Sequence, residues 1–349
     1  MVGDSRFLRA CRGEPHDRVP VWFMRQAGRY QPSYRALRAR YSMLQLARSP
    51  KLLSDVTVSA VEELGVDAAI LFSDIMIPLD GTGITFDIEE NVGPVVAEPL
   101  RTGHDIARLR TFSPGLLNYV FEGIRLTVDR LGGTPLIGFS GAPFTLASYL
   151  AEGGPSRTYR WTKRLMWAEE EAFKALMEYL SDMVVRYLTA QAQAGASALQ
   201  LFDSWVGALS LSDYRSHVLP HMRRIFKDLA KLQVPLIYFG VGAQHLLADM
   251  AGSGATVLGV DWRIPLPMAR AAAGSAVGLM GNLDPQRLLA GWPAVESGSR
   301  EILRSMSRDP QFIFNLGHGV PKEVDPALLK RLVSWIHGWE SEKMEEEGY

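Results

Sequence analysis

The strongest constraint on the fold is a recurrence of short apolar runs separated by segments of helical character. Each run is continuous rather than alternating, which is typical of strands buried on both faces of a parallel sheet. Eight such runs occur, over Val19–Met24, Ala68–Phe72, Pro135–Phe139, Ser197–Phe202, Val234–Phe239, Thr256–Val260, Ala276–Met280 and Gln311–Asn315.

The segments between the runs carry helix signals. Ser49 and Pro50 suit the N-cap and the first position of a helix, Lys51–Leu64 has apolar residues at helical spacing, and Gly65 can end it. Thr158–Ala194 is long enough for two helices. Three further helices are predicted over Ser212–Leu232, strained by Pro220 in its interior, over Leu283–Leu289 and over Ala327–Trp339.

Eight strands alternating with helices predict one α/β domain over residues 1–349, folded as a closed (β/α)8 TIM-type barrel. The alternative is a doubly wound sheet with an appended domain, but no linker rich in Pro, Gly and Ser divides the chain. Residues 81–110 exceed a simple connection and predict an elaborated loop or hairpin at the carboxyl face of the strands. The acidic residues 340–349 are expected to fray.

Composition excludes several classes of protein. The net charge of −1 is not that of a nucleic-acid or polybasic membrane binder, and no apolar stretch is long enough for a membrane span. A single cysteine, Cys11, excludes a disulfide framework and a multi-thiolate zinc site. The polar N-terminus lacks a secretory signal. We therefore expect a cytoplasmic protein without a membrane span or a nucleic-acid partner.

Functional side chains of a parallel barrel gather at the carboxyl ends of its strands. The residues Arg25-Gln26-Ala27-Gly28-Arg29 follow the first run, and Asp74 follows the second. Ser204 follows the fourth run, and His318 lies between two glycines after the last. Ser204 is outside a G-x-S-x-G turn, so it is not expected to be an acyl-transfer nucleophile. The histidines show no metal-binding spacing, and no metal site is predicted.

The first of these segments has an unusual charge pattern. Residues 18–54 contain eight Arg and Lys and no Asp or Glu. For residues 35–48 a solvated helical face, paired with acids from elsewhere, is an equal alternative. Arg25 and Arg29 differ because they follow a buried strand and flank a glycine, where guanidinium groups need anionic partners. We expect these two to bind carboxylate or phosphate.

Asp74 is expected at the same rim as Arg25 and Arg29. An Asp after a strand often caps a helix or forms a simple salt bridge, and the sequence leaves that alternative open. The functional alternative is an ionised carboxylate whose pKa is lowered by nearby arginines and which accepts hydrogen bonds from a substrate. Tyr149 either packs in the core or presents its hydroxyl.

Two longer motifs resemble the signatures of one protein family. Pro20-Val-Trp-Phe-Met-Arg-Gln-Ala-Gly-Arg29 resembles the N-terminal signature of the uroporphyrinogen decarboxylase family, and residues 138–153 resemble its second signature. Supporting matches run in order along the chain at Phe72–Ile75, Phe202–Trp205, Val260–Arg263, Gly281–Pro285 and Asn315–Gly319.

The resemblance implies a cofactor-free carboxy-lyase that converts uroporphyrinogen III into coproporphyrinogen III, a precursor of haem and chlorophyll. It implies that Arg25 to Arg29, Tyr149, Ser204 and His318 bind the substrate and that Asp74 faces the pyrrole nitrogens. It also implies a barrel fold and a cytoplasmic homodimer. His318 would be a carboxylate partner, and a pKa near 6.5 would weaken binding above that pH.

Two other functions fit parts of the sequence. A methyltransferase of the same barrel superfamily, acting on cobalamin or a thiol, would need zinc ligands that a chain with only Cys11 lacks. A non-catalytic carrier of tetrapyrroles or other polyanions would explain the arginines, but not an acid facing the same cavity.

Overall fold

Seven of the eight predicted strands form one curled parallel sheet in the computed structural model, which describes residues 4–339. The predicted fraying of residues 340–349 lies outside the described residues. The strands of this sheet are β1 (Ala69–Ile70), β4 (Leu136–Gly141), β5 (Ala198–Asp203), β6 (Leu236–Gly240), β7 (Val257–Gly259), β8 (Gly278–Leu283) and β9 (Phe312–Leu316). They pair in chain order, and every pair is parallel. A doubly wound sheet reverses its strand order at a switch point, so that alternative is wrong.

The first predicted strand, Val19–Met24, is not a strand but a single bridge between Val21 and Phe314 of β9. The reason is local chemistry. Pro20 has no N–H to donate, and the N–H of Val21 donates to the carboxylate of Asp67 at 2.9 Å instead of to a neighbouring strand. The segment still lies between the two edges of the sheet. Phe314 N–H donates to Pro20 O, and Asp67 N–H donates to Val21 O. The sequence predicted a closed barrel of eight strands. The structure instead has a curled sheet of seven strands, with the bridging segment in the place of the eighth.

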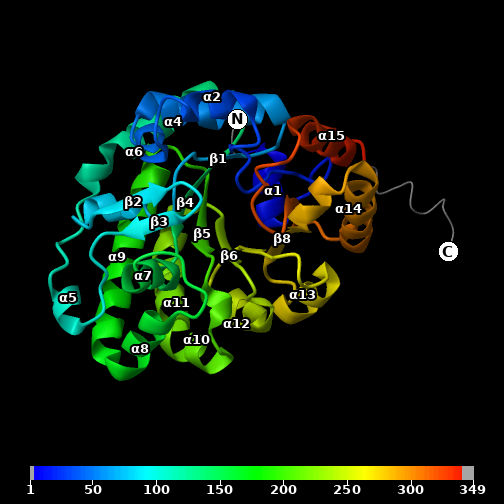
Figure 1. Cartoon of the computed structure of the whole chain (residues 1–349). Coiled ribbons are helices and arrows are strands. Elements are labelled where there is room, and N and C mark those ends of the chain that lie inside the picture. Colours follow the sequence, from blue (N-terminus) through cyan, green and yellow to red (C-terminus); the bar gives the residue numbers. More distant parts are fainter. Residues whose placement is uncertain (1–3, 340–349) are drawn as a thin grey trace.

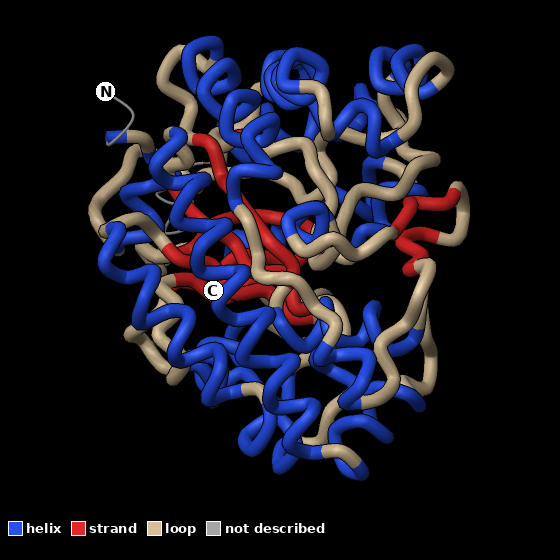
Figure 2. The backbone as a smooth tube through the Cα atoms, turned by 90° about the vertical axis from the view of Figure 1, so that its left-hand side faces the viewer, coloured by secondary structure: helices blue, strands red, loops and turns tan. Residues whose placement is uncertain are grey.

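Helices surround the sheet, as Figures 1 and 2 show. Within residues 4–339 the α-helices are α1 (Arg6–Arg12), α2 (Pro32–Arg38), α3 (Met43–Ala47), α4 (Pro50–Leu64), α5 (Gly103–Ala107), α6 (Asn118–Arg130), α7 (Pro143–Glu152), α8 (Arg160–Ala168), α9 (Glu170–Ala194), α10 (Leu211–His217), α11 (Leu219–Leu229), α12 (Leu247–Ala251), α13 (Leu266–Ala273), α14 (Trp292–Met306) and α15 (Pro326–His337). Neighbouring helices pack on one another around the outside, α4 on α6, α6 on α9 and α9 on α11.

The helix signals in the sequence act as expected at α4. The Ser49 hydroxyl accepts a hydrogen bond from Leu52 N–H, Pro50 occupies the first turn, and Gly65 ends the helix in the left-handed conformation. Residues 158–194 form the two predicted helices, α8 and α9.

Two helix predictions need correction. Residues 212–232 are not one helix, because the chain breaks at Val218 and Pro220 lies in the first turn of α11, where its missing N–H costs no hydrogen bond. The helix predicted over residues 283–289 is a short 3-10 helix over Pro285–Leu289.

The long connection after β1 contains the predicted hairpin. Strands β2 (Phe86–Glu89) and β3 (Gly93–Val96) pair antiparallel, and Asn91 lies in the turn between them. In Figure 1 this hairpin lies beside the main sheet in cyan, and it packs on α3 and α7.

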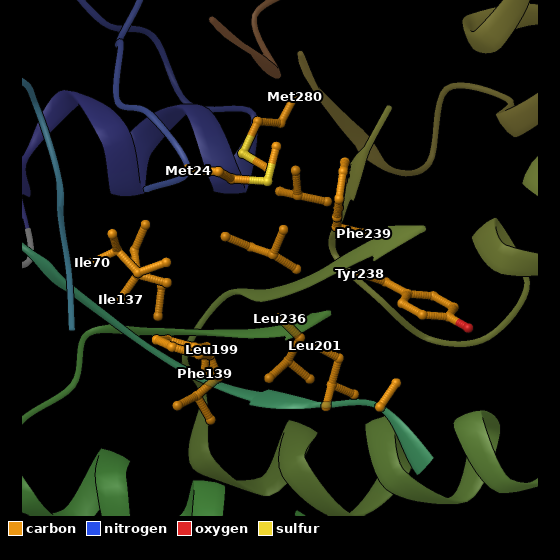
Figure 3. Packing of buried hydrophobic residues seen from close by; sticks show 14 of the residues in the cluster. Met24, Ile70, Ile137, Phe139, Leu199, Leu201, Leu236, Tyr238, Phe239 and Met280 are labelled. Atoms are coloured by element: carbon orange, nitrogen blue, oxygen red, sulfur yellow. The ribbon is translucent and has the colours of Figure 1, made fainter. Parts of the chain in front are cut away.

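The apolar runs are buried as their continuity predicts. All six residues of β4 and all six of β8 are buried. Figure 3 shows Ile70 of β1 beside its register partner Ile137 of β4. Met24, which follows the bridging segment, is joined to the same interior through Asn315, which accepts from Met24 N–H and contacts the Met280 sulfur.

Candidate active site

Side chains from four distant parts of the chain come together at the carboxyl rim of the sheet. Asp74 follows β1, Tyr149 lies on α7 after β4, His318 follows β9, and Arg25 follows the bridging segment. Arg25 is close enough to influence the ionisation of each of the other three. The predicted convergence of Arg25 and Asp74 is therefore present.

Asp74 sits where its charge is poorly solvated. Burial raises the pKa of its carboxyl, and the Met76 N–H, which donates to it at 2.9 Å, and the nearby Arg25 only partly oppose this. The expected lowering of the Asp74 pKa by arginines is wrong in direction, because loss of water outweighs one neighbouring cation. The carboxylate is held by a backbone donor in a site of low polarity, where it interacts strongly with any positive charge.

Arg25 adopts a backbone conformation that few residues other than glycine occupy, with φ of 59°. Its side chain lies directly against Gly319, where a Cβ would overlap the Arg25 Cγ and Cδ atoms. Glycine at this position therefore leaves the space that Arg25 occupies beside His318. In residues 4–339 Arg25 forms no ion pair with a carboxylate, and the residue as a whole is exposed.

Arg29 lies toward the hairpin rather than against Asp74. Its Nη1 is 3.5 Å from the side-chain oxygen of Asn91 in the β2–β3 turn, and the side chain is exposed. The residues between the two arginines shape the turn. Gln26 is buried, and its side-chain amide donates to Ala68 O and accepts from Phe23 N–H, so both polar atoms are bonded within the protein.

Ala27 and Gly28 also serve the turn. Ala27 packs on a small apolar cluster, and the Gly28 N–H donates to the Gln31 side chain at 3.1 Å. Of the five residues predicted in this segment, the structure leaves the two guanidinium groups as the side chains available to a ligand.

Other cations of the acid-free segment have partners. Arg48 pairs with Asp80, as the solvated-face alternative expects, and Arg35 and Arg38 donate to backbone carbonyl oxygens. Lys51 pairs with Asp55 on its own helix. Arg25 thus differs from these neighbours, because it lies near Asp74, Tyr149 and His318 and no acid is bonded to it.

His318 is neutral in this environment. Burial together with Arg25 and Arg263 lowers the pKa of its imidazole to about 4, although Asp261 acts in the opposite direction. The condition of a pKa near 6.5, under which binding would weaken above that pH, is therefore not met. The ring lies edge-on to Phe239 and Trp262, with centroids 6.4 Å away in each case, and at neutral pH it can donate one hydrogen bond to an anion.

Tyr149 forms one wall of the rim. Its ring stacks on Trp205 at 3.9 Å, and burial and the nearby Asp74 raise the pKa of its hydroxyl, while Arg25 opposes them. The hydroxyl therefore stays protonated and can donate. Ser204, the residue before Trp205, is half-buried at the same loop.

The structure adds residues that the sequence reasoning did not assign. Asp261 accepts from Gly242 N–H, Arg263 N–H and the Arg263 guanidinium, and Arg263 in turn lies 4.0 Å over the Trp262 ring. These residues follow β7 and border His318. Their position directly after an apolar run was the available signal.

A groove on another part of the protein does not coincide with these site residues. A groove of about 1220 Å³ lies between α3, the start of α4 and the β2–β3 hairpin. Its cations Arg48 and Lys51 are already paired with acids, and it contains none of the predicted site residues. We place the site at the rim because the unpaired arginine and the half-buried acid meet there.

Comparison with known proteins identifies the family of the chain. Residues 3–339 match the family model described as uroporphyrinogen decarboxylase (URO-D). The chain belongs to the uroporphyrinogen decarboxylase family. It is therefore an enzyme of the carboxy-lyase class, and decarboxylation in tetrapyrrole biosynthesis is its general activity.

Two curated relatives illustrate the similarity to this family. Uroporphyrinogen decarboxylase from Geobacillus kaustophilus is 51% identical over 339 residues, which cover 97% of this chain and 98% of the relative. The enzyme of the same name from Bacillus subtilis is 48% identical over 341 residues, covering 97% and 96%.

Solved structures support the fold. A methyltransferase from Methanosarcina mazei superposes with a TM-score of 0.80 over 95% of this chain and 97% of that chain, at 19% identity. At that identity the likeness concerns architecture alone. In residues 4–339 no three His, Cys, Asp or Glu side chains are grouped so as to hold a metal ion. No helix of that region combines the length and apolarity needed to cross a bilayer.

Proposed function

We propose that this enzyme removes the carboxyl groups of the four acetate side chains of uroporphyrinogen III and releases coproporphyrinogen III. The observation that most supports this is the meeting of Arg25, Asp74, Tyr149 and His318 at one rim. Membership of the family supports the choice of substrate.

The substrate has eight carboxylates, and its recognition is assigned to Arg25 and Arg29. Guanidinium groups bind carboxylates through two parallel hydrogen bonds, which fixes orientation as well as neutralising charge. The protonated hydroxyl of Tyr149, the neutral imidazole of His318 and the Ser204 hydroxyl supply further donors. Gln26, Ala27 and Gly28 act through the turn that holds the two arginines.

Decarboxylation needs an acceptor for the electron pair of the breaking C–C bond, and the pyrrole ring serves as that acceptor. Protonation of the ring carbon that bears the acetate gives a cationic iminium-like ring. The C–C electrons then flow into the ring as CO₂ leaves. Protonation of the former CH₂ carbon and loss of the ring proton leave a methyl group, so each cycle consumes one proton and needs no cofactor.

Asp74 is assigned the stabilisation of that cation. Its carboxylate accepts hydrogen bonds from the pyrrole N–H groups, in a site where desolvation makes the attraction strong. Comparable preorganised groups contribute roughly 3–4 kcal/mol to transition-state stabilisation. Arginine has a pKa above about 12, so Arg25 is a poor acid, and we assign it to holding a substrate carboxylate or a water molecule.

The wider setting follows from the family resemblance. We propose that residues 1–349 act as one domain, that the working form is a homodimer and that the enzyme acts in the cytoplasm. Sedimentation of the purified protein at micromolar concentration tests the dimer directly.

The reaction is tested by anaerobic incubation of the purified enzyme with uroporphyrinogen III, with products separated by carboxyl number. The proposal expects hepta-, hexa-, penta- and tetracarboxylate species to appear in turn with release of CO₂. Binding of the macrocycle with all eight carboxylates retained would identify a carrier instead.

A further inference from the structure

A second group of arginines surrounds one tryptophan beside the rim. The guanidinium carbons of Arg101, Arg160 and Arg164 lie 4.5, 4.7 and 5.5 Å from the centre of the Trp161 ring. All three arginine side chains are exposed, and Arg160 and Arg164 are one helical turn apart on α8. We call these four residues the Trp161 cluster.

The cluster has more positive charge than its surroundings neutralise. Residues 153–168 contain three arginines and one lysine and no acid. The nearby acids are occupied: Glu152 accepts from the backbone and hydroxyl of Thr162, and Asp105 accepts from Arg101 N–H and pairs with Arg108. Within residues 4–339 neither Arg160 nor Arg164 forms an ion pair. Three clustered guanidinium groups repel one another, which favours a bound anion.

The cluster is joined to the wall of the active site. Tyr159, which precedes Arg160, contacts the Trp205 ring at 5.3 Å, and Trp205 stacks on Tyr149. Arg101 donates to the last carbonyl oxygens of α7, the helix that bears Tyr149. Figure 1 shows α7 and α8 next to each other, in agreement with their contact.

Hydrogen bonds to neighbouring segments hold the helix that carries the Trp161 cluster in place. Lys163 donates to Ala208 O in the loop after β5, and Thr162 is bonded to Glu152 at the end of α7. Tyr159 is fixed in a left-handed turn with φ of 53°, where its N–H donates to the Ser156 hydroxyl. The arginines are thus presented from a fixed helix beside the rim.

We propose that the Trp161 cluster is an anion-capture surface that attracts the polycarboxylate substrate before it reaches the rim. The inference rests on the proposed function. A protein of net charge −1 has no overall attraction for a polyanion, so any steering must come from a local group of cations near the entrance. The small area of the cluster suits a compact molecule with several carboxylates.

The test uses Arg160→Gln/Arg164→Gln and, as the binding probe, uroporphyrin, the oxidised macrocycle with the same eight carboxylates. At low ionic strength we expect its association rate constant, measured by stopped-flow fluorescence, to fall about 3- to 10-fold. The dependence of that rate on ionic strength should flatten, and the two proteins should converge near 0.5 M salt, where charges are screened over about 4–5 Å. Because Arg160 and Arg164 are not among the residues assigned to the reaction, kcat for decarboxylation should be unchanged.

Two further variants separate charge from structure. Arg125→Gln/Arg308→Gln removes the same charge from exposed positions on α6 and before β9, and it should leave the association rate within a factor of two of the wild type. Arg160→Lys/Arg164→Lys keeps the charge and should restore fast association. If the double glutamine variant fails to fold, the single variants Arg160→Gln and Arg164→Gln should each show a smaller decrease.

Equal association rates and equal salt dependence in the two glutamine double variants would overturn the proposal, as would a fall confined to kcat. Failure of the proposed function has a different signature. In that case the wild type itself would not decarboxylate uroporphyrinogen, whatever the behaviour of the cluster.

Discussion

Two residues of the site are held in states that cost folding free energy. Burial raises the pKa of Asp74, and Arg25 has a positive φ that costs on the order of 1–3 kcal/mol in a non-glycine residue. Such states persist where the surrounding structure fixes them, and they concentrate at functional sites. Their presence side by side supports the assignment on physical grounds that are independent of sequence similarity.

The placement of Arg25 by Gly319 can be tested with a matched pair of glycines. In Gly319→Ala the new methyl group overlaps the flexible Arg25 side chain, which can rotate away, so kcat/KM should fall by about 10- to 100-fold with little change in stability. In Gly317→Ala it overlaps the backbone of Trp262, which cannot, so the free energy of unfolding should fall by about 1–3 kcal/mol. Steady-state kinetics and urea unfolding separate the two. A fully active Gly319→Ala enzyme would refute this role of the glycine.

The pKa of about 4 for His318 predicts a particular pH profile. In the free enzyme the imidazole gains a proton only near pH 4, so it is neutral throughout pH 6–8 and contributes no change of charge there. The pH profile of kcat/KM reports groups that titrate in the free enzyme. The wild type and His318→Asn should therefore have the same profile near pH 6.5, without a step due to His318. A wild-type step of that kind would mean that the imidazole is charged below pH 6.5, as an ordinary histidine is.

At the scale of elements, the sequence predicted those strands that consist of an uninterrupted run of apolar residues. Continuous apolar runs located β1 and β4 to β9, and capping residues located α4. The strand predicted over the first run was wrong, because the Val21 N–H donates to the carboxylate of Asp67, a residue distant in sequence. Likewise, the pKa of Asp74 depends on how much water reaches it, a property of the assembled rim that no local pattern records.

Asp67 joins the bridging segment to both ends of the described chain. It accepts from Val21 N–H, from Arg6 at 2.7 Å and from His337 of α15 at 2.8 Å. Burial alone would raise the pKa of Asp67, but these partners lower it overall. An acid with a lowered folded pKa stabilises the protein at neutral pH, and this contribution is lost as the pH falls through that pKa.

Asp67→Asn should therefore lower the free energy of unfolding at pH 7 by about 1–3 kcal/mol, because it removes the charge of a buried acceptor, while Arg6 keeps its pair with Asp17. The difference from the wild type should begin to shrink below about pH 4, where the carboxyl of the unfolded chain takes up a proton, and should disappear below the lowered pKa of the folded protein. Urea unfolding at pH 7 and at acid pH measures both effects. An equally stable variant at pH 7 would show that the segment is held by its other contacts.

At the scale of the whole molecule, the barrel brings chemistry from both ends of the chain to one rim. The in-order pairing of the strands places Asp74, Tyr149 and His318 around Arg25, although none of them is near another in sequence. The family motifs predicted the meeting of Arg25, Asp74, Tyr149 and His318, but not that Arg29 lies toward the hairpin. Their charge states and the Trp161 cluster were not predictable, because both arise from contacts between segments that are distant in sequence.

The central claim is that a desolvated carboxylate at this rim stabilises a cationic intermediate, and Asp74→Asn tests it most directly. Because an amide has no charge to desolvate, the variant should be at least as stable as the wild type at pH 7. Its kcat for uroporphyrinogen should nevertheless fall by roughly 100- to 1000-fold. Wild-type turnover in a folded Asp74→Asn enzyme would contradict the claim.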